Sequence, residues 1–122
     1  MGEIIAHDVS FDPSVNVYDM HTEEKVRRFI EVECPGVMQE DVELEELPNG
    51  VKLIIQKGKA ISEAMVQPVY PIRQHHGTWE RDFSFDPSEG KFEIHNPEEF
   101  KLENGILKIV LIRQAQPRKW KL

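Results

Sequence analysis

Apolar and polar residues alternate along most of the chain, and this period of two limits the possible folds more than any other feature. Ile30, Val32 and Cys34 share one side of the stretch 26–34, while the glutamates between them share the other. Helical spacing of apolar residues is hard to find in any window of about eleven residues. We therefore expect a protein built almost entirely from short β-strands.

Turn-forming residues divide this pattern into separate strands. Pro35-Gly36 stops the first long strand, because proline donates no hydrogen bond to a sheet and glycine enters a turn without steric cost. Asn49-Gly50 and Asn104-Gly105 each join two apolar runs, which is typical of a β-hairpin. Asn96 and Pro97 begin a single helical turn. The expected strands are 15–18, 26–34, 42–47, 51–56, 78–85, 100–103 and 106–113, with an edge strand near 69–73 and a short extended piece at 92–94.

Strands of this number and length predict an antiparallel, immunoglobulin-like β-sandwich of about seven to eight strands. A chain of 122 residues is enough for one such domain and too short for two. We expect the domain at 15–113, between a short N-terminal arm at 1–14 and a short C-terminal tail at 114–122. The stretch 58–77 is expected to be a long loop, because its prolines forbid a continuous helix.

The chain is acidic, with 22 Asp and Glu against 15 Lys and Arg and a net charge of −7. Such a surface repels phosphate groups, so nucleic acid and anionic membranes are not expected partners. The basic residues at 113–121 are better explained as a solvated tail. No apolar run approaches the ~18 residues of a membrane helix, and the N-terminus lacks the features of a secretory signal. With only one cysteine, the chain is expected to be a soluble cytoplasmic protein.

Residue patterns that carry catalytic chemistry are sparse. His75 and His76 are adjacent and do not easily bind one metal ion together, so we expect exposed loop histidines. Cys34 has no sequence sign of a helix N-terminus or a basic neighbour that would lower its pKa, so we expect a buried structural thiol. A glycine-rich phosphate loop is also absent from the sequence. We therefore expect no enzyme activity, no metal and no cofactor, and no use of ATP.

Three short sequence motifs occur one after another along the chain. Cys34-Pro35-Gly36 ends a strand and is followed by Glu40-Asp41-Val42 and the first hairpin. The stretch 77–83 reads Gly-Thr-Trp-Glu-Arg-Asp-Phe, and the stretch 102–109 reads Leu-Glu-Asn-Gly-Ile-Leu-Lys-Ile. These resemble the Leu-Pro-Gly, Gly-x-Phe-x-Arg-x-Phe and Leu-x-Asn-Gly-Val-Leu-x-Ile motifs of the small heat-shock proteins, the family of the α-crystallin domain. The resemblance spans nearly the whole chain.

The sequence departs from this family in several places. Cys34 replaces the leucine before Pro-Gly, and Phe100 stands where an alanine is common. The flanks at 1–14 and 114–122 are short, which favours a dimer or small oligomer over a large assembly. The Ile-x-Ile tail motif of the family is absent. Trp120-Lys121-Leu122 has an apolar-x-apolar pattern, but we favour a tail of ordinary composition over a docking motif.

The resemblance implies an ATP-independent holdase chaperone that binds partly unfolded client proteins and prevents their aggregation. It also implies a groove between the strands at 42–47 and 100–103, which in the family accepts the tail of a neighbour or a competing ligand. The lining residues would be Val42, Leu44, Phe100 and Leu102. Each of these four is equally well explained as an ordinary core residue.

Self-association is a further implication of the resemblance. Arg81 aligns with an arginine of the family's dimer interface, and Trp79 lies on the same strand face. A buried arginine would need a carboxylate or an aromatic ring beside it, whereas an exposed one would not. Apolar residues of the long loop would reach a second subunit, although they could also fold back onto their own sandwich. Those expected in the interface are Met65, Val69 and Tyr70.

Two other classes of function remain open at this point. A monomeric co-chaperone or scaffold of the CS-domain type would present a similar sandwich to one folded partner. The Arg81 motif and the long loop disfavour that class, and the mass in solution would separate it from a self-associating chaperone. A metal-dependent β-sandwich enzyme is the least favoured, and it would require stoichiometric metal.

Overall fold

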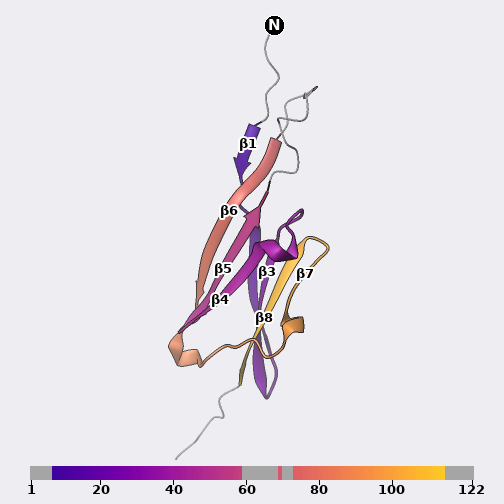
Figure 1. The fold of residues 1–122 in the computed structure, drawn as a ribbon. Helices are drawn as coiled ribbons and strands as arrows, with labels where there is room; N and C mark the ends of the chain where they lie inside the picture. The colour runs from indigo at the N-terminus through magenta and orange to yellow at the C-terminus, as the bar shows by residue number, and fades with distance from the viewer. Residues whose placement is uncertain (1–6, 59–68, 70–72, 115–122) are drawn as a thin grey trace, which may run out of the picture.

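The computed structural model describes residues 7–58, 69 and 73–114, which form two four-stranded sheets packed as a sandwich (Figure 1). One sheet has the strand order β1-β6-β5-β4, and the other has the order β2-β3-β8-β7. The strands are β1 (His7–Ser10), β2 (Ser14–His21), β3 (Lys25–Glu33), β4 (Val42–Leu47), β5 (Gly50–Lys57), β6 (Arg73–Ser84), β7 (Phe100–Glu103) and β8 (Ile106–Gln114). Three single 3-10 turns complete the described elements: η1 (Gln39–Asp41), η2 (Pro87–Glu89) and η3 (Pro97–Glu99).

This architecture confirms the predicted all-β sandwich. Most neighbouring strands pair antiparallel, as expected. The exception is β1, which lies within the stretch expected to be an arm and pairs parallel with the first four residues of β6 (Figure 1). Its four residues are too few for a visible alternation, so the sequence carried no sign of this strand. Beyond β1, residues 77–84 of β6 pair with β5 on one side and have no described strand on the other side.

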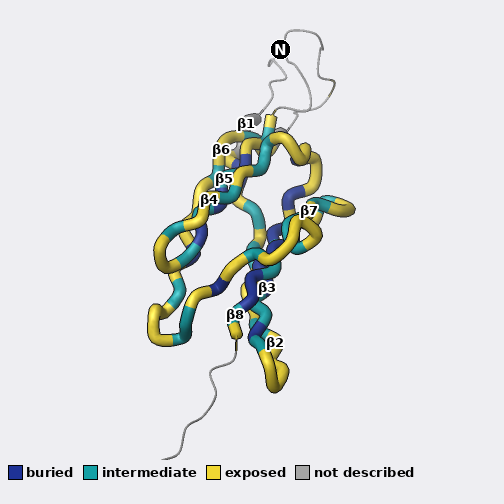
Figure 2. The backbone as a smooth tube through the Cα atoms, turned by 60° about the horizontal axis from the view of Figure 1, so that its bottom comes forward, coloured by how far each residue is buried: buried dark blue, intermediate teal, exposed yellow. Residues whose placement is uncertain are grey.

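The core lies between the sheets and is built from the alternating residues of β3, β5 and β8. Figure 2 shows the buried segments following these strands. The predicted common face of β3 is confirmed, since Ile30, Val32 and Cys34 are all completely buried. The other completely or almost completely buried side chains are Val51, Leu53, Ile55, Leu107, Ile109 and Leu111.

The β4–β5 hairpin is confirmed, but its turn differs from the expected one. Leu47 pairs with Gly50, so the two central residues of the turn are Pro48 and Asn49, and neither has a positive φ. Proline holds its own φ near −65°, which excludes the primed turns that Asn-Gly otherwise favours. Gly50 is instead required by close packing, because a Cβ there would overlap the carbonyl oxygen of Phe83.

The second hairpin, between β7 and β8, has the turn that its sequence predicts. Asn104 and Gly105 both have positive φ, 52° and 75°, as a primed turn requires. The helical turn expected at Asn96 is also present as η3. The Asn96 side chain accepts from the Glu98 amide, and Glu99 accepts from the Asn96 amide to complete a capping box.

Cys34 provides a direct test of the buried face of β3. Its thiol is completely buried and donates a long hydrogen bond, 3.6 Å, to the Val32 carbonyl oxygen. Burial raises the pKa of the Cys34 thiol, which lowers the fraction of reactive thiolate. We expect the native thiol to react with Ellman's reagent at least roughly a hundredfold more slowly than the unfolded one, because reaction requires local opening. Rapid labelling of the folded protein in native buffer would contradict this placement.

Candidate binding groove

The strands β4 and β7 are edge strands of opposite sheets, and a groove runs between them. Edge strands present unpaired backbone N–H and C=O groups, which can pair with another chain. The predicted lining residues Val42 and Leu44 pair with buried residues of β5, and Phe100 and Leu102 pair with buried residues of β8. All four are half-buried and pack against the core, so the structure brings the predicted groove residues together.

Two hollows follow one another along this groove. The first, about 190 Å³, is bordered by Val42, Phe100 and Leu102. The second, about 440 Å³, lies between Leu44 and Phe100. Phe100 borders both hollows, so the two lie next to each other. Further lining residues that the sequence analysis did not assign are Gln39, Lys101 and Leu107 in the first hollow, and Glu46, Ile94, His95, Asn96 and Pro97 in the second.

Two polar residues of the second hollow, His95 and Asn96, are held in place by hydrogen bonds to Glu99 of η3. Glu99 accepts hydrogen bonds from the amides of His95, at 2.8 Å, and Asn96, at 3.4 Å. This fixes the backbone that leads into β7 and therefore the position of Phe100. The capping motif was visible in the sequence, but its location beside the groove depends on the pairing of the two sheets. The arrangement suits a short apolar segment with an extended backbone rather than a chemical reaction.

Three of the five predicted interface residues lie in the described part of the chain. Arg81 is exposed, and its guanidinium lies 5.0 Å from the centre of the Phe83 ring. Trp79 is half-buried opposite Ile55 and packs partly against the core. Val69 is 75% exposed, whereas Met65 and Tyr70 lie outside the described residues. Of the alternatives considered for Arg81, the structure therefore has an exposed arginine stacked on an aromatic ring.

The edge strand β2 carries exposed apolar residues that the sequence analysis did not assign to a site. Val17, Tyr18 and Met20 are 46%, 42% and 53% exposed. The Tyr18 ring stacks on Phe29 of β3 with the ring centres 5.0 Å apart, and its hydroxyl donates to Glu31 at 2.6 Å. No strand of the described segments covers this edge, so it combines backbone groups and apolar side chains in a way suited to contact with another chain.

A cluster around Arg28 joins β2 and β3 to the connection that follows β6. The guanidinium donates two hydrogen bonds to Asp19, at 2.7 and 2.9 Å, and one to Glu89 at 3.2 Å. It also lies over the rings of Phe85 and Phe92, 5.0 and 4.4 Å from their centres. Only 14% of the Arg28 side chain is exposed. The hydrogen bonds to Arg28 lower the pKa of the Asp19 carboxyl despite its partial burial.

Groups suited to other chemistry are not assembled in the described part of the chain. Among residues 7–58, 69 and 73–114, no three His, Cys, Asp or Glu side chains are placed to hold a metal ion. His75 and His76 lie in β6 rather than in the loop where we expected them, because this strand begins earlier than its sequence pattern suggests. The helices of the described segments are three-residue turns, so none can cross a membrane.

Comparison with known proteins gives matches at the level of structure alone. No protein-family model matches the sequence, and no curated protein does. Heat shock protein 16.0 from Schizosaccharomyces pombe superposes with a TM-score of 0.58 at 20% identity, over 92% of this chain and 96% of that one. HSP18.5 from E. histolytica gives 0.56 at 18% identity, over 90% and 94%. A small heat-shock protein from Xylella fastidiosa gives 0.59 at 14% identity, over 92% and 96%.

The chain has the fold of the small heat-shock proteins. In this α-crystallin sandwich, the three sequence motifs occupy distinct structural positions. Pro35-Gly36 follows β3, the arginine motif at 77–83 lies in β6, and the Asn-Gly motif forms the β7–β8 hairpin. The three motifs therefore belong to one sandwich, two of them at turns and one within a strand.

Proposed function

We propose that this protein is an ATP-independent holdase that binds partly unfolded proteins and prevents their aggregation. The observation that carries the proposal is the groove between β4 and β7, two sheet edges that no described strand covers. It is lined by Val42, Leu44, Phe100 and Leu102. A partly unfolded client exposes extended segments with apolar side chains and unpaired backbone groups. Such a segment can use both features of the groove, since strand addition supplies hydrogen bonds and the hollows accept apolar side chains.

Binding of this kind requires no nucleotide. Capture and release follow the concentration of exposed client segments, because binding is a reversible equilibrium. The net charge of −7 supports the same function, since like charges on loaded complexes oppose further association. A free, buried thiol is compatible with a reducing compartment, and we propose that the protein acts in the cytoplasm.

We also propose that the protein forms a dimer or small oligomer. Two edges without a neighbouring strand among the described residues support this: β2, with its exposed Val17 and Met20, and the part of β6 that carries Arg81. The structural similarity to three small heat-shock proteins does not favour the monomeric adaptor. Light scattering after size-exclusion chromatography tests the proposal. A strict monomer over a wide concentration range would contradict self-association and reopen the adaptor hypothesis.

The holdase proposal is tested by light scattering of a reduced or heated client protein without nucleotide. We expect suppression of aggregation at substoichiometric to equimolar protein. Replacing Phe100 and Leu102 together by serine should raise the amount of protein needed for half-suppression by about tenfold, which corresponds to about 1.4 kcal/mol of binding free energy. Both side chains are half-buried, so circular dichroism must first show that the variant is folded.

A matched control separates binding in the groove from nonspecific hydrophobic binding. Ile106 is apolar and 43% exposed, and it precedes the buried Leu107 in β8, so the two side chains point to opposite faces of the sheet. Ile106→Ser should leave suppression close to that of the unmodified protein. Equal losses in the Ile106 and groove variants would contradict the groove as the client site. No suppression by the unmodified protein at any ratio would overturn the holdase proposal itself.

A further inference from the structure

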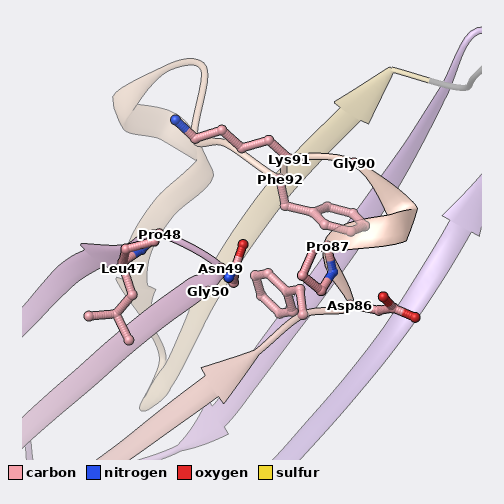
Figure 3. Close-up of a pocket in the computed structure, with 10 residues that line it drawn as sticks. Leu47, Pro48, Asn49, Gly50, Asp86, Pro87, Gly90, Lys91 and Phe92 are labelled. Carbon is pink, nitrogen blue, oxygen red and sulfur yellow. The ribbon is translucent and has the colours of Figure 1, made fainter.

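A separate hollow lies at the end of the sandwich where the β4–β5 turn meets the connection after β6 (Figure 3). Its volume is about 150 Å³. Cavities of about this volume accommodate one aromatic ring. The lining residues are Leu47, Pro48, Asn49, Gly50, Phe85, Asp86, Pro87, Gly90, Lys91 and Phe92.

Two phenylalanines and two prolines form part of the wall of this hollow. Phe85 and Phe92 lie with their ring centres 5.2 Å apart at an angle of 59°, and Figure 3 shows the Phe92 ring turned toward the hollow. Arg28 lies over both rings and is itself held by carboxylates, so these walls are rigidly supported. Aromatic faces and proline rings offer a flat apolar surface to an indole.

The path of β8 brings the chain directly to this wall. Glu93 and Ile112 exchange two backbone hydrogen bonds, of 2.8 and 2.9 Å, as an antiparallel pair does. Continuing that register places Phe92 beside Arg113 and Lys91 beside Gln114. The contact between the Arg113 guanidinium and the Phe92 ring, 5.4 Å from its centre, agrees with this register. The chain therefore leaves β8 next to Lys91, which lines the hollow.

The sequence after Gln114 supplies a matching side chain within reach. Trp120 is six residues farther on, and six extended residues span at most about 20 Å. Arg118, Lys119 and Lys121 surround it in sequence. The exposed carboxyl of Asp86 lies at the rim of the hollow, and the backbone amide of Ser88 donates to it at 2.9 Å. The hollow thus offers aromatic and proline rings, with Asp86 as its acidic group, to a segment that carries an indole among cations. Lys91 also lines the hollow, and its charge is paired with Glu93 at 3.3 Å.

We propose that the hollow is the binding site for Trp120 of the same chain. The indole would fill the space between Phe85, Phe92 and Pro87, and the neighbouring cations would face Asp86. Docking of this kind fastens the segment after β8 to the end of the sandwich and covers the half-buried Phe85. A docked Trp120 differs from the solvated tail that the sequence alone favours. The proposal is independent of the holdase function.

Fluorescence of the full chain tests this proposal. The chain has two tryptophans, so Trp79→Phe leaves Trp120 as the single emitting indole. We expect its emission at shorter wavelength than that of the unfolded chain, with weaker quenching by acrylamide. Asn49→Phe places an exposed ring at the mouth of the hollow and should increase the acrylamide quenching constant at least about twofold, because the docked population falls. Asn16→Phe, at an exposed position on β2, should not change it.

Dilution identifies which chain supplies the indole. Docking within one chain is independent of protein concentration, because the effective concentration of the segment is set by its length. Emission that is unchanged over a roughly hundredfold dilution therefore supports the proposal. Emission that shifts to longer wavelength on dilution would overturn it in favour of a second copy's Trp120. A fully exposed indole in the folded protein, unaffected by Asn49→Phe, would overturn it altogether.

Discussion

Replacing Gly50 by alanine should lower the free energy of unfolding by about 3 kcal/mol, at the upper end of the range for overpacked sites. A Cβ at this position would overlap the carbonyl oxygen of Phe83 and would lie 3.0 Å from its carbonyl carbon. These are backbone atoms of the paired strand β6, so no side-chain rotation relieves the overlap. The two strands would have to separate at the start of β5, where Val51 and Leu53 enter the core.

Thermal unfolding measures this effect, with a decrease of about 10 °C in Tm expected for a loss of this size in a domain of this length. Gly58→Ala is the matched control, because a Cβ at Gly58 meets no atom within 4 Å. That variant should be neutral or slightly more stable, since alanine restricts the unfolded chain. Equal losses of stability in the two variants would show that the loss is not specific to Gly50 and does not come from the overlap with β6.

Arg28→Met should lower the free energy of unfolding by about 3 kcal/mol, because it leaves Asp19 partly buried without its partner. The variant keeps a side chain of similar length but loses three hydrogen bonds and two contacts with aromatic rings. Chemical denaturation measures the loss. The exposed pair of Lys101 and Glu103, 3.7 Å apart, supplies the control, and Lys101→Met should cost less than about 0.5 kcal/mol.

The Arg28 cluster also makes stability depend on acid. The pKa of Asp19 is lower in the folded protein than its ordinary value of 3.8, because Arg28 holds the carboxylate. Its contribution to stability is therefore present above about pH 3.8 and decreases as the pH falls through the folded pKa. The stability difference between the unmodified protein and Arg28→Met should shrink below that pH. A difference that stays constant would indicate that the aromatic contacts, not the ion pair, carry the effect.

The fold could be predicted from the sequence because its signals are local. Alternation in β3 and the two Asn-Gly turns specify strands and hairpins within a few residues of one another. The strand β1 and the early start of β6 could not be predicted, since each exists only through pairing with the other. The requirement for glycine at position 50 could not be predicted either, because the atom that excludes a Cβ belongs to a residue 33 positions away.

The candidate sites show the same division between local and distant information. The resemblance to the small heat-shock proteins identified four groove residues, and the two sheets bring them together. They are Val42, Leu44, Phe100 and Leu102. The Arg28 cluster was not predicted, because Asp19 and Glu89 come from separate parts of the chain and no spacing rule connects them. Residues joined only by tertiary structure leave no periodic signal in one sequence.

The pairing of β3 with β8 has a consequence for the order of folding. Each hairpin closes over a few residues, whereas Lys25 pairs with Gln114 and Glu33 with Ile106, across most of the domain. Closing so long a loop costs entropy before any contact repays it, so contacts of this kind form late and slow the folding of β-sandwiches. During that interval the apolar faces of the hairpins are uncovered, and the newly made chain is briefly the kind of molecule that we propose it binds.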